Sequence, residues 1–209
     1  MTTPRPRLLL AGAHVAALAE ALGGLAADAA RIDALGRRLA ARLAAGGQCL
    51  VAGNGGSAAH AQHLTAELVG RYRTERPPLA AIALHADTST FTALSNDYPP
   101  ADVFARQVSA FGRPGDVLVC ISSSGRSPNL LAAAHAGGAA GLAVWALTGP
   151  RPNPLADTAD EAVAVDAPYA ATVQEVHQVV VHLLAAAVDD VLTPNTVPVD
   201  SRSGAGSAP

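Results

Sequence analysis

The chain has 209 residues, of which 50% are hydrophobic and 15% charged, so it can bury the core of a globular protein. Its net charge of −3 and pI near 6.1 give no basic field for a polyanion, and its 14 cationic side chains are scattered arginines. We therefore expect no nucleic-acid partner. Cys49 and Cys120 stand in apolar runs without a paired spacing, and we interpret both as reduced core residues.

Residues 8–45 are rich in Ala and Leu with helical spacing, and Gly23 and Gly24 interrupt the pattern, so we expect two helices here. Two arginines before three leucines faintly resemble a signal peptide, but His14 and Glu20 break up the apolar segment. No later uncharged stretch reaches membrane-spanning length. We therefore expect a cytoplasmic protein with no membrane partner.

Four short apolar runs follow, separated by segments of helical length. The runs are Cys49–Ala52, Leu79–Leu84, Val117–Ile121 and Leu142–Leu147. This alternation predicts an α/β fold, with a central, mainly parallel sheet flanked by helices. A last helix is expected over Thr172–Val191, with valines along one stripe. With no internal repeat or linker, the sequence predicts a single domain over residues 1–192 and a disordered tail over 193–209.

The first strand leads into a glycine loop, Gly53–Ser57, and then into an Ala-rich helix. Such a turn directs backbone N–H groups and the positive end of a helix at an anion or a hydroxyl-rich ligand. A simple strand-to-helix turn that needs glycine is one alternative. A dinucleotide site is another, because Gly53, Gly55 and Ala58 fit G-x-G-x-x-G/A. That site also needs an acidic residue about twenty positions on, and the nearest candidate, Asp87, lies well beyond.

A serine loop, Ser122–Ser127, follows the third apolar run and precedes another helix. Ser127 is placed as an N-cap and Pro128 as the first helical residue, which explains one of the four serines. Four hydroxyls and a glycine at a helix N-terminus make a cradle for a phosphate dianion, with neutral donors and the helix dipole providing the attraction.

Polar residues also stand on two of the expected helices. His63 and Glu67 are four residues apart and share a helix face, although such a pair is commonly only a solvated one. The last helix carries Gln174, Glu175, Gln178 and His182 among valines. Helical geometry places Glu175 or Gln178 slightly better in line with His182 than Gln174, and spacing alone does not choose among them.

Taken together, these segments resemble the SIS (sugar isomerase) domain family, and within it most closely the phosphoheptose isomerases, over about residues 30–190. The matching segments are Gly53–Ser57, His63–Glu67, Gly70–Tyr72, Asn96–Asp97, Ser122–Ser127 and Gln174–His182. The resemblance implies a three-layer SIS-type domain preceded by the N-terminal helices. It also implies a homotetramer with active sites at subunit interfaces.

The resemblance further implies conversion of sedoheptulose 7-phosphate to D-glycero-D-manno-heptose 7-phosphate through an enediol. Glu67 is then the base at carbon and His182 the opposite acid or base. Zn²⁺ is expected on the positions that match the family's ligands, namely His63, Glu67, Gln174 and His182. The positions expected to hold substrate are Asn54, Gly55, Gly56, Glu67, Asn96, Asp97, Ser122, Ser123, Ser124, Ser127 and Gln174.

Some features do not follow from this resemblance. Enterobacterial-type isomerases have an acidic residue and an arginine where this chain has Ala171–Val173, so a proton relay or phosphate contact there is missing. The Asn96-Asp97 pair is also explained by a polar turn before two prolines. Arg71 fits an exposed ion pair as well as a phosphate contact. A non-catalytic SIS module that binds a sugar phosphate or a protein partner is the alternative function.

Overall fold

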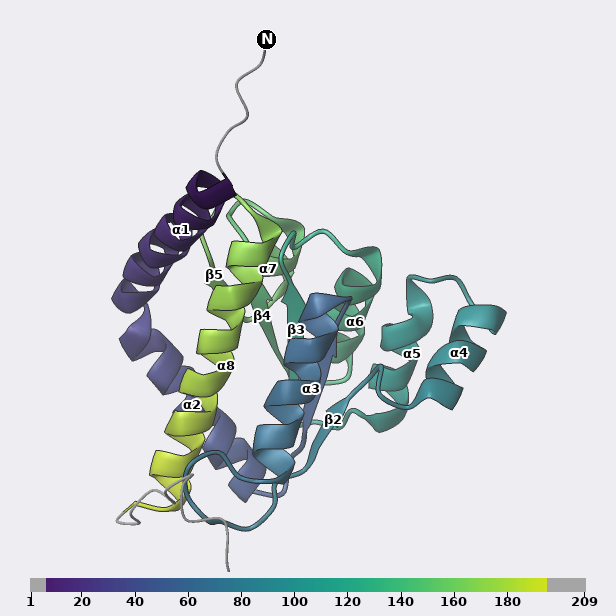
Figure 1. The fold of residues 1–209 in the computed structure, drawn as a ribbon. Coiled ribbons are helices and arrows are strands. Elements are labelled where there is room, and N and C mark those ends of the chain that lie inside the picture. Colours follow the sequence, from purple (N-terminus) through teal and green to yellow (C-terminus); the bar gives the residue numbers. More distant parts are fainter. Residues whose placement is uncertain (1–6, 195–209) are drawn as a thin grey trace, which may run out of the picture.

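The computed structural model describes residues 7–194, which form a five-stranded parallel sheet with helices on both faces (Figure 1). The strands, in the spatial order β2-β1-β3-β4-β5, are β1 (Cys49–Gly53), β2 (Ala81–Ala83), β3 (Val117–Ser122), β4 (Ala143–Thr148) and β5 (Glu161–Ala164). The helices are α1 (Arg7–Ala27), α2 (Ala29–Ala44), α3 (Gly56–Val69), α4 (Thr88–Asp97), α5 (Asp102–Phe111), α6 (Pro128–Ala139), α7 (Pro154–Thr158) and α8 (Ala170–Leu192). The predicted α/β fold is confirmed.

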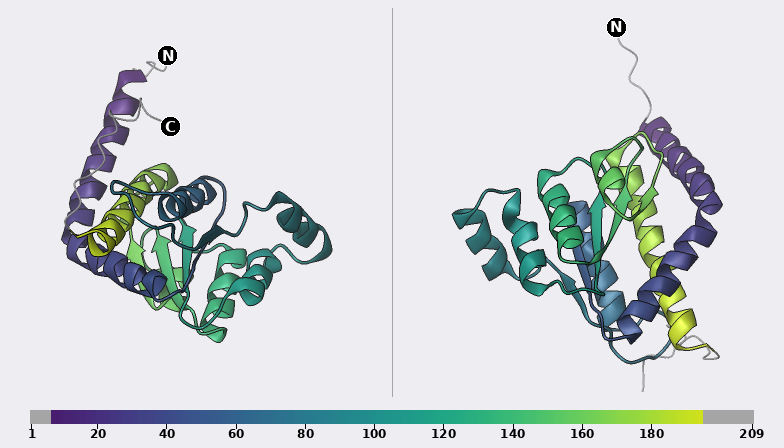
Figure 2. Two further views of the ribbon diagram at one scale, coloured as in Figure 1. Left: turned by 90° about the horizontal axis from the view of Figure 1, so that it is seen from below. Right: turned by 180° about the vertical axis from the view of Figure 1, so that it is seen from behind.

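Two apolar cores lie on opposite faces of the sheet, because successive strand residues point to opposite sides. Leu50 belongs to one core and Val51 to the other. Helices α1, α2, α3 and α8 cover the Val51 face, and α5, α6 and α7 cover the Leu50 face (Figure 2). The central strands β1 and β3 are buried along their whole length, which explains their continuous apolar sequence.

Strand β5 was not anticipated from the sequence. It has only four residues and lies at the sheet edge beside β4, so its apolar run is too short to separate from a loop. The second predicted strand is also shorter than its apolar run, because only Ala81–Ala83 pair with β1. The tail expected over residues 193–209 lies outside the described residues from residue 195 onward.

The boundary between the first two helices differs from the prediction. Helix α1 continues through Gly23 and Gly24 and ends at Ala27, and Asp28 separates it from α2. A glycine inside a helix costs about 1 kcal/mol relative to alanine, which weakens a helix without ending it. Helix α2 then packs closely on α8 at Gly36, where an added Cβ atom would lie 2.5 Å from Cβ of Ala187.

Two helical segments, Leu10–Ala27 and Ala170–Leu192, are long and apolar enough to cross a membrane by length and composition alone. The second segment contains Glu175, Asp189 and Asp190, so it is not the uncharged stretch that the sequence was expected to lack. More than half of the second segment is buried within the protein, and the first lies near the N-terminus. Core helices and signal sequences satisfy the same criterion, so it is weak evidence for a membrane span.

Several titratable groups are buried in the two cores. Both cysteines are unpaired strand residues, and burial raises each thiol pKa to about 12, as expected for inert core positions. His177 on α8 is fully buried, and its Nε2 lies 3.0 Å from the backbone oxygen of Thr148 at the end of β4. Burial lowers the pKa of His177 to about 4, so the ring is neutral at physiological pH.

We predict that His177→Gln makes stability less dependent on pH. The unfolded histidine takes up a proton below about pH 6.5, whereas the folded one stays neutral to about pH 4, so falling pH favours the unfolded wild type. Within this window, His177 thus lowers the free energy of unfolding by up to about 1.4 kcal/mol for each pH unit that the pH falls. Urea unfolding at several pH values measures this pH dependence, and His135→Gln, at an exposed position, is the control. An unchanged slope in His177→Gln would contradict the prediction.

Candidate active site

Two polar loops meet where the strand order reverses. Strands β1 and β3 are direct neighbours, while the chain proceeds from β1 outward to β2 and from β3 outward to β4. In open parallel sheets, ligands bind outside the carboxyl ends of the strands at such a switch point. The glycine loop follows β1 and the serine loop follows β3, so the fold brings the two predicted loops to one edge.

The glycine loop is a tight turn that starts α3. Gly55 has a φ of 55°, which a side chain would strain, and α3 begins at the next residue. An added Cβ atom at Gly56 would lie 2.7 Å from Oε1 of Gln174, so the end of this long α8 side chain reaches the backbone at the start of α3. The side-chain amide of Gln174 therefore lies beside the glycine loop.

The serine loop turns its hydroxyls toward one another at the start of α6. Oγ of Ser122 lies 3.4 Å from Oγ of Ser127 and accepts a hydrogen bond of 3.1 Å from the backbone N–H of Gly125. Ser127 occupies the N-cap position as predicted, with Pro128 following, but its side chain makes no capping hydrogen bond. The hydroxyl expected to cap the helix is thus turned into the serine cluster, where it adds a donor for an anion.

A residue that the sequence did not single out links the two loops. The side chains of Asn54 and Asn129 form a reciprocal amide pair, with both N–H···O distances 3.0 Å. Asn129 lies in the first turn of α6 directly after Pro128, and only this position beside the serine loop marks it in the sequence. The pair holds the glycine loop against the start of α6 across the switch point.

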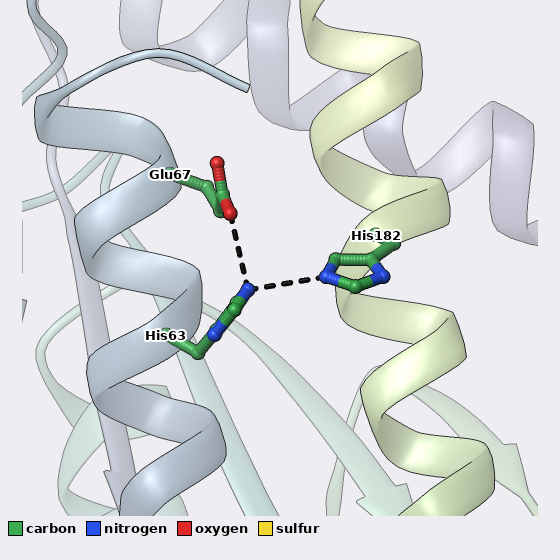
Figure 3. A group of neighbouring side chains, drawn as sticks. All are labelled: His63, Glu67 and His182. Atoms are coloured by element: carbon green, nitrogen blue, oxygen red, sulfur yellow. Dashed lines mark hydrogen bonds and ion pairs between the residues drawn. The ribbon is translucent and has the colours of Figure 1, made fainter. Parts of the chain in front are cut away.

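A compact group of polar side chains lies between α3 and α8 (Figure 3). Nε2 of His63 is 3.0 Å from Oε1 of Glu67 and 3.1 Å from Nε2 of His182. One candidate ligand atom from each of the three residues lies within 4.8 Å of the other two. Of the two α3 residues, Glu67 is the more buried, with 19% of its side chain exposed compared with 41% for His63. The structure thus brings together three of the predicted site residues, His63 and Glu67 from α3 and His182 from α8.

His182 sits in a partly enclosed environment. The ring of Tyr72 stacks on the imidazole with centroids 5.5 Å apart. Burial lowers the pKa of His182, with the neighbouring His63 and Arg73 acting in the same direction and Glu67 opposing them. The imidazole is therefore neutral at physiological pH, the form that acts as a base or binds a metal.

The glutamine next to His182 is Gln178, one helical turn away on α8, and its Nε2 lies 3.0 Å from Nε2 of His182. Gln174 was expected in the same ligand set. Its amide instead lies against Gly56, and the seven residues from there to His63 correspond to roughly 10 Å along α3. Within one chain, Gln174 therefore lies at the start of α3, and the histidine cluster lies further along, near the middle of the helix.

Two other expected positions lie apart from the loops. Asn96 and Asp97 end helix α4, which has no buried residue, and they bond to each other with Nδ2 of Asn96 2.8 Å from Oδ1 of Asp97. They belong to a helix and not to the polar turn considered as an alternative. Arg71 forms an exposed ion pair with Glu75 at 3.6 Å, which is the first of the two roles considered for it, the other being a phosphate contact.

Comparison with known proteins agrees with this architecture. A family model for the SIS domain matches residues 13–149. With the parallel sheet and its two polar loops, this match shows that the chain belongs to the SIS-domain family. The dinucleotide interpretation is not supported, since Asp87, its nearest acidic candidate, caps α4 by accepting hydrogen bonds from Thr90.

The relatives narrow the assignment. A phosphoheptose isomerase from Streptomyces coelicolor is 60% identical over 179 residues, covering 86% of this chain and 78% of that protein. The structure of a phosphoheptose isomerase from Francisella tularensis superposes with a TM-score of 0.84 at 34% identity, and one from Neisseria gonorrhoeae with 0.83 at 36%. Each covers 89% of this chain and 100% of the solved chain. Within the SIS-domain family, the chain belongs to the phosphoheptose isomerases.

Proposed function

We propose that the protein converts sedoheptulose 7-phosphate to D-glycero-D-manno-heptose 7-phosphate through an enediol. The coarser statement, that it is an aldose–ketose isomerase of sugar phosphates, follows from its membership of the phosphoheptose isomerases. The observation that supports the finer proposal most strongly is the meeting of Glu67 with His182 through His63. A module that only binds sugar phosphate has no need of a carboxylate and two imidazoles in contact.

The phosphate is assigned to the serine loop. Ser122, Ser123, Ser124 and Ser127 offer neutral donors at the N-terminus of α6, where the helix dipole favours an anion. The sugar hydroxyls are assigned to the amides of Asn54 and Gln174 and to the backbone of Gly55 and Gly56. This division matches a substrate with one charged end and a polyhydroxyl chain.

The isomerisation moves one proton between adjacent carbons and others between the two oxygens. The Glu67 carboxylate takes the proton from C1 of the ketose and returns it to C2, and His182 transfers the hydroxyl proton from O1 to O2. Nε2 of His63 lies within hydrogen-bonding distance of both groups, so it orients them relative to each other. Asn96 and Asp97 on α4 are proposed to contact substrate only when the protein is assembled.

The three clustered residues also suit a metal. Two imidazole nitrogens and one carboxylate oxygen form a donor set that Zn²⁺ prefers, and separations of 3.0 and 3.1 Å approach the edge of a tetrahedron with bonds of about 2.1 Å. We propose that His63, Glu67 and His182 hold Zn²⁺. The amide oxygen of Gln178 is the nearest glutamine ligand within the chain, and Gln174 is the one that the family resemblance implies. When bound, the ion polarises the substrate oxygens.

A cytoplasmic homotetramer remains our proposal for the working form. Helix α1 exposes Leu10 and Val15 with 65% and 64% of each residue accessible, an apolar surface suited to a second subunit. Two buried, unpaired cysteines suit a reducing compartment.

We predict that Glu67→Gln lowers kcat for sedoheptulose 7-phosphate by roughly 100- to 10,000-fold, because the amide keeps the shape and loses the base. Product is measured by NMR with purified protein. Glu175→Gln is the matched control, since this carboxylate on α8 pairs with His14 outside the cluster. No heptose phosphate from the wild type, or full activity in Glu67→Gln, would contradict the proposed function.

The metal is tested separately from turnover. We predict about one Zn²⁺ per chain by elemental analysis after zinc addition and desalting, and its loss in His63→Ala, which removes one of the three donors. His135→Ala removes an exposed histidine from α6 and should keep the zinc. Equal zinc retention by both variants would place the metal elsewhere.

A further inference from the structure

A buried ion pair lies beyond the catalytic cluster, at the far end of the α3–α8 contact. Nε of Arg76 is 3.0 Å from Oδ1 of Asp189, and the two side chains are 0% and 5% exposed. Asp189 is two helical turns after His182 on α8, so both residues lie on the same face of that helix. Arg76 follows α3 in the connection to β2.

Arg76 binds the C-terminal end of α3 directly. Its guanidinium donates to the backbone oxygen of Glu67 itself and, at 2.9 Å, to that of Leu68, and it also reaches Gly70. These are carbonyls that a helix end leaves without intrahelical partners, where a cation also complements the helix dipole. The same guanidinium that holds Asp189 on α8 therefore holds the backbone that carries the proposed base.

Asp189 fixes the connection after α3. Its Oδ2 accepts hydrogen bonds from the backbone N–H groups of Arg73 at 2.8 Å and Thr74 at 3.0 Å. Burial alone would raise the pKa of Asp189, but these bonds and the one from Arg76 outweigh it and lower the pKa. The carboxylate is thus ionised and has partners on both oxygens.

The fixed connection places an aromatic ring on the catalytic imidazole. Tyr72 precedes the two held amides and stacks on His182 at 5.5 Å, with the rings 27° from parallel. The guanidinium of Arg73 lies over Tyr72, 4.9 Å from the ring centroid. The connection therefore contacts His182 through Tyr72 while its backbone is held by Asp189.

We propose that the Arg76–Asp189 pair is a positioning device for the isomerase site, fixing Glu67 through the end of α3 and His182 through Tyr72. This inference rests on the proposed function. An apolar pair could fill the same volume, but it would leave the carbonyl of Glu67 and the backbone amides of Arg73 and Thr74 unsatisfied. The charged pair satisfies these groups from two parts of the fold, with Arg76 in the α3–β2 connection and Asp189 on α8. The positions of the catalytic groups therefore depend on the ion pair.

The test is steady-state kinetics of Asp189→Asn and Arg76→Lys, at a temperature where circular dichroism shows each fully folded. We expect kcat to fall at least tenfold with KM within twofold, because the substrate-holding loops lie at the opposite end of α3. Asp190→Asn is the matched control one residue along, since it breaks an exposed pair with Arg37 and should leave kcat unchanged. Val108→Ala, in the core on the other face, controls for lost stability.

Full kcat in folded Asp189→Asn would overturn the inference, as would an equal loss of kcat in Val108→Ala at matched melting temperature. If Asp189→Asn does not fold, the kcat of Arg76→Lys tests the inference. This variant keeps the buried positive charge but loses the several N–H donors of the guanidinium.

A second readout needs no turnover. The imidazole proton resonances of His182, assigned with His182→Gln, carry the ring-current shift of Tyr72, which Tyr72→Leu defines. We expect Asp189→Asn to move them toward their Tyr72→Leu positions and Asp190→Asn to leave them in place. Unmoved resonances in Asp189→Asn would overturn the inference even if the protein is active. A wild type inactive on sedoheptulose 7-phosphate but with shifted resonances would refute the proposed substrate and retain the positioning.

Discussion

The side-by-side packing of α3 and α8 determines where the polar groups of the site lie. Both helices bury apolar stripes on one face of the sheet, with Leu64 and Leu68 from α3 against Val176 and Val180 from α8 in the same core. Polar residues on the flanks of these stripes must then meet along the line of contact. Gln174 reaches the start of α3, His182 its middle and Asp189 its end. Stability and chemistry therefore share one interface.

The sheet contributes a different kind of site, built mainly from neutral donors. At the carboxyl ends of β1 and β3, glycine provides close backbone approach and serine provides hydroxyls, while α3 and α6 contribute their positive ends. The cation within the serine loop, Arg126, donates to the backbone oxygen of Pro152 instead of turning to the hydroxyls. The proposed binding of a phosphate dianion at this loop would thus depend on oriented dipoles, in keeping with a chain that has no basic surface run.

Much of this arrangement could be predicted because local rules specify it. Continuous apolar runs identified the buried strands, and the glycine and serine loops followed two of them directly. The short edge strand β5, the passage of α1 through two glycines, and the amide pair of Asn54 with Asn129 required the folded chain. So did the placement of Gln178 beside His182, since helical spacing left several glutamine and glutamate candidates open. Tertiary distances, which no local pattern contains, decide such choices.

The central claim is that a carboxylate held between α3 and α8 moves a proton between adjacent carbons of a ketose phosphate. It is tested most directly by running the reaction on sedoheptulose 7-phosphate in D₂O and examining C2 of the aldose by NMR. A proton carried on Glu67 exchanges with solvent, so the account predicts deuterium at C2. A product whose C2 carries only substrate hydrogen, even after many reversible turnovers in D₂O, would indicate direct transfer from C1 and would contradict the role assigned to the α3–α8 cluster.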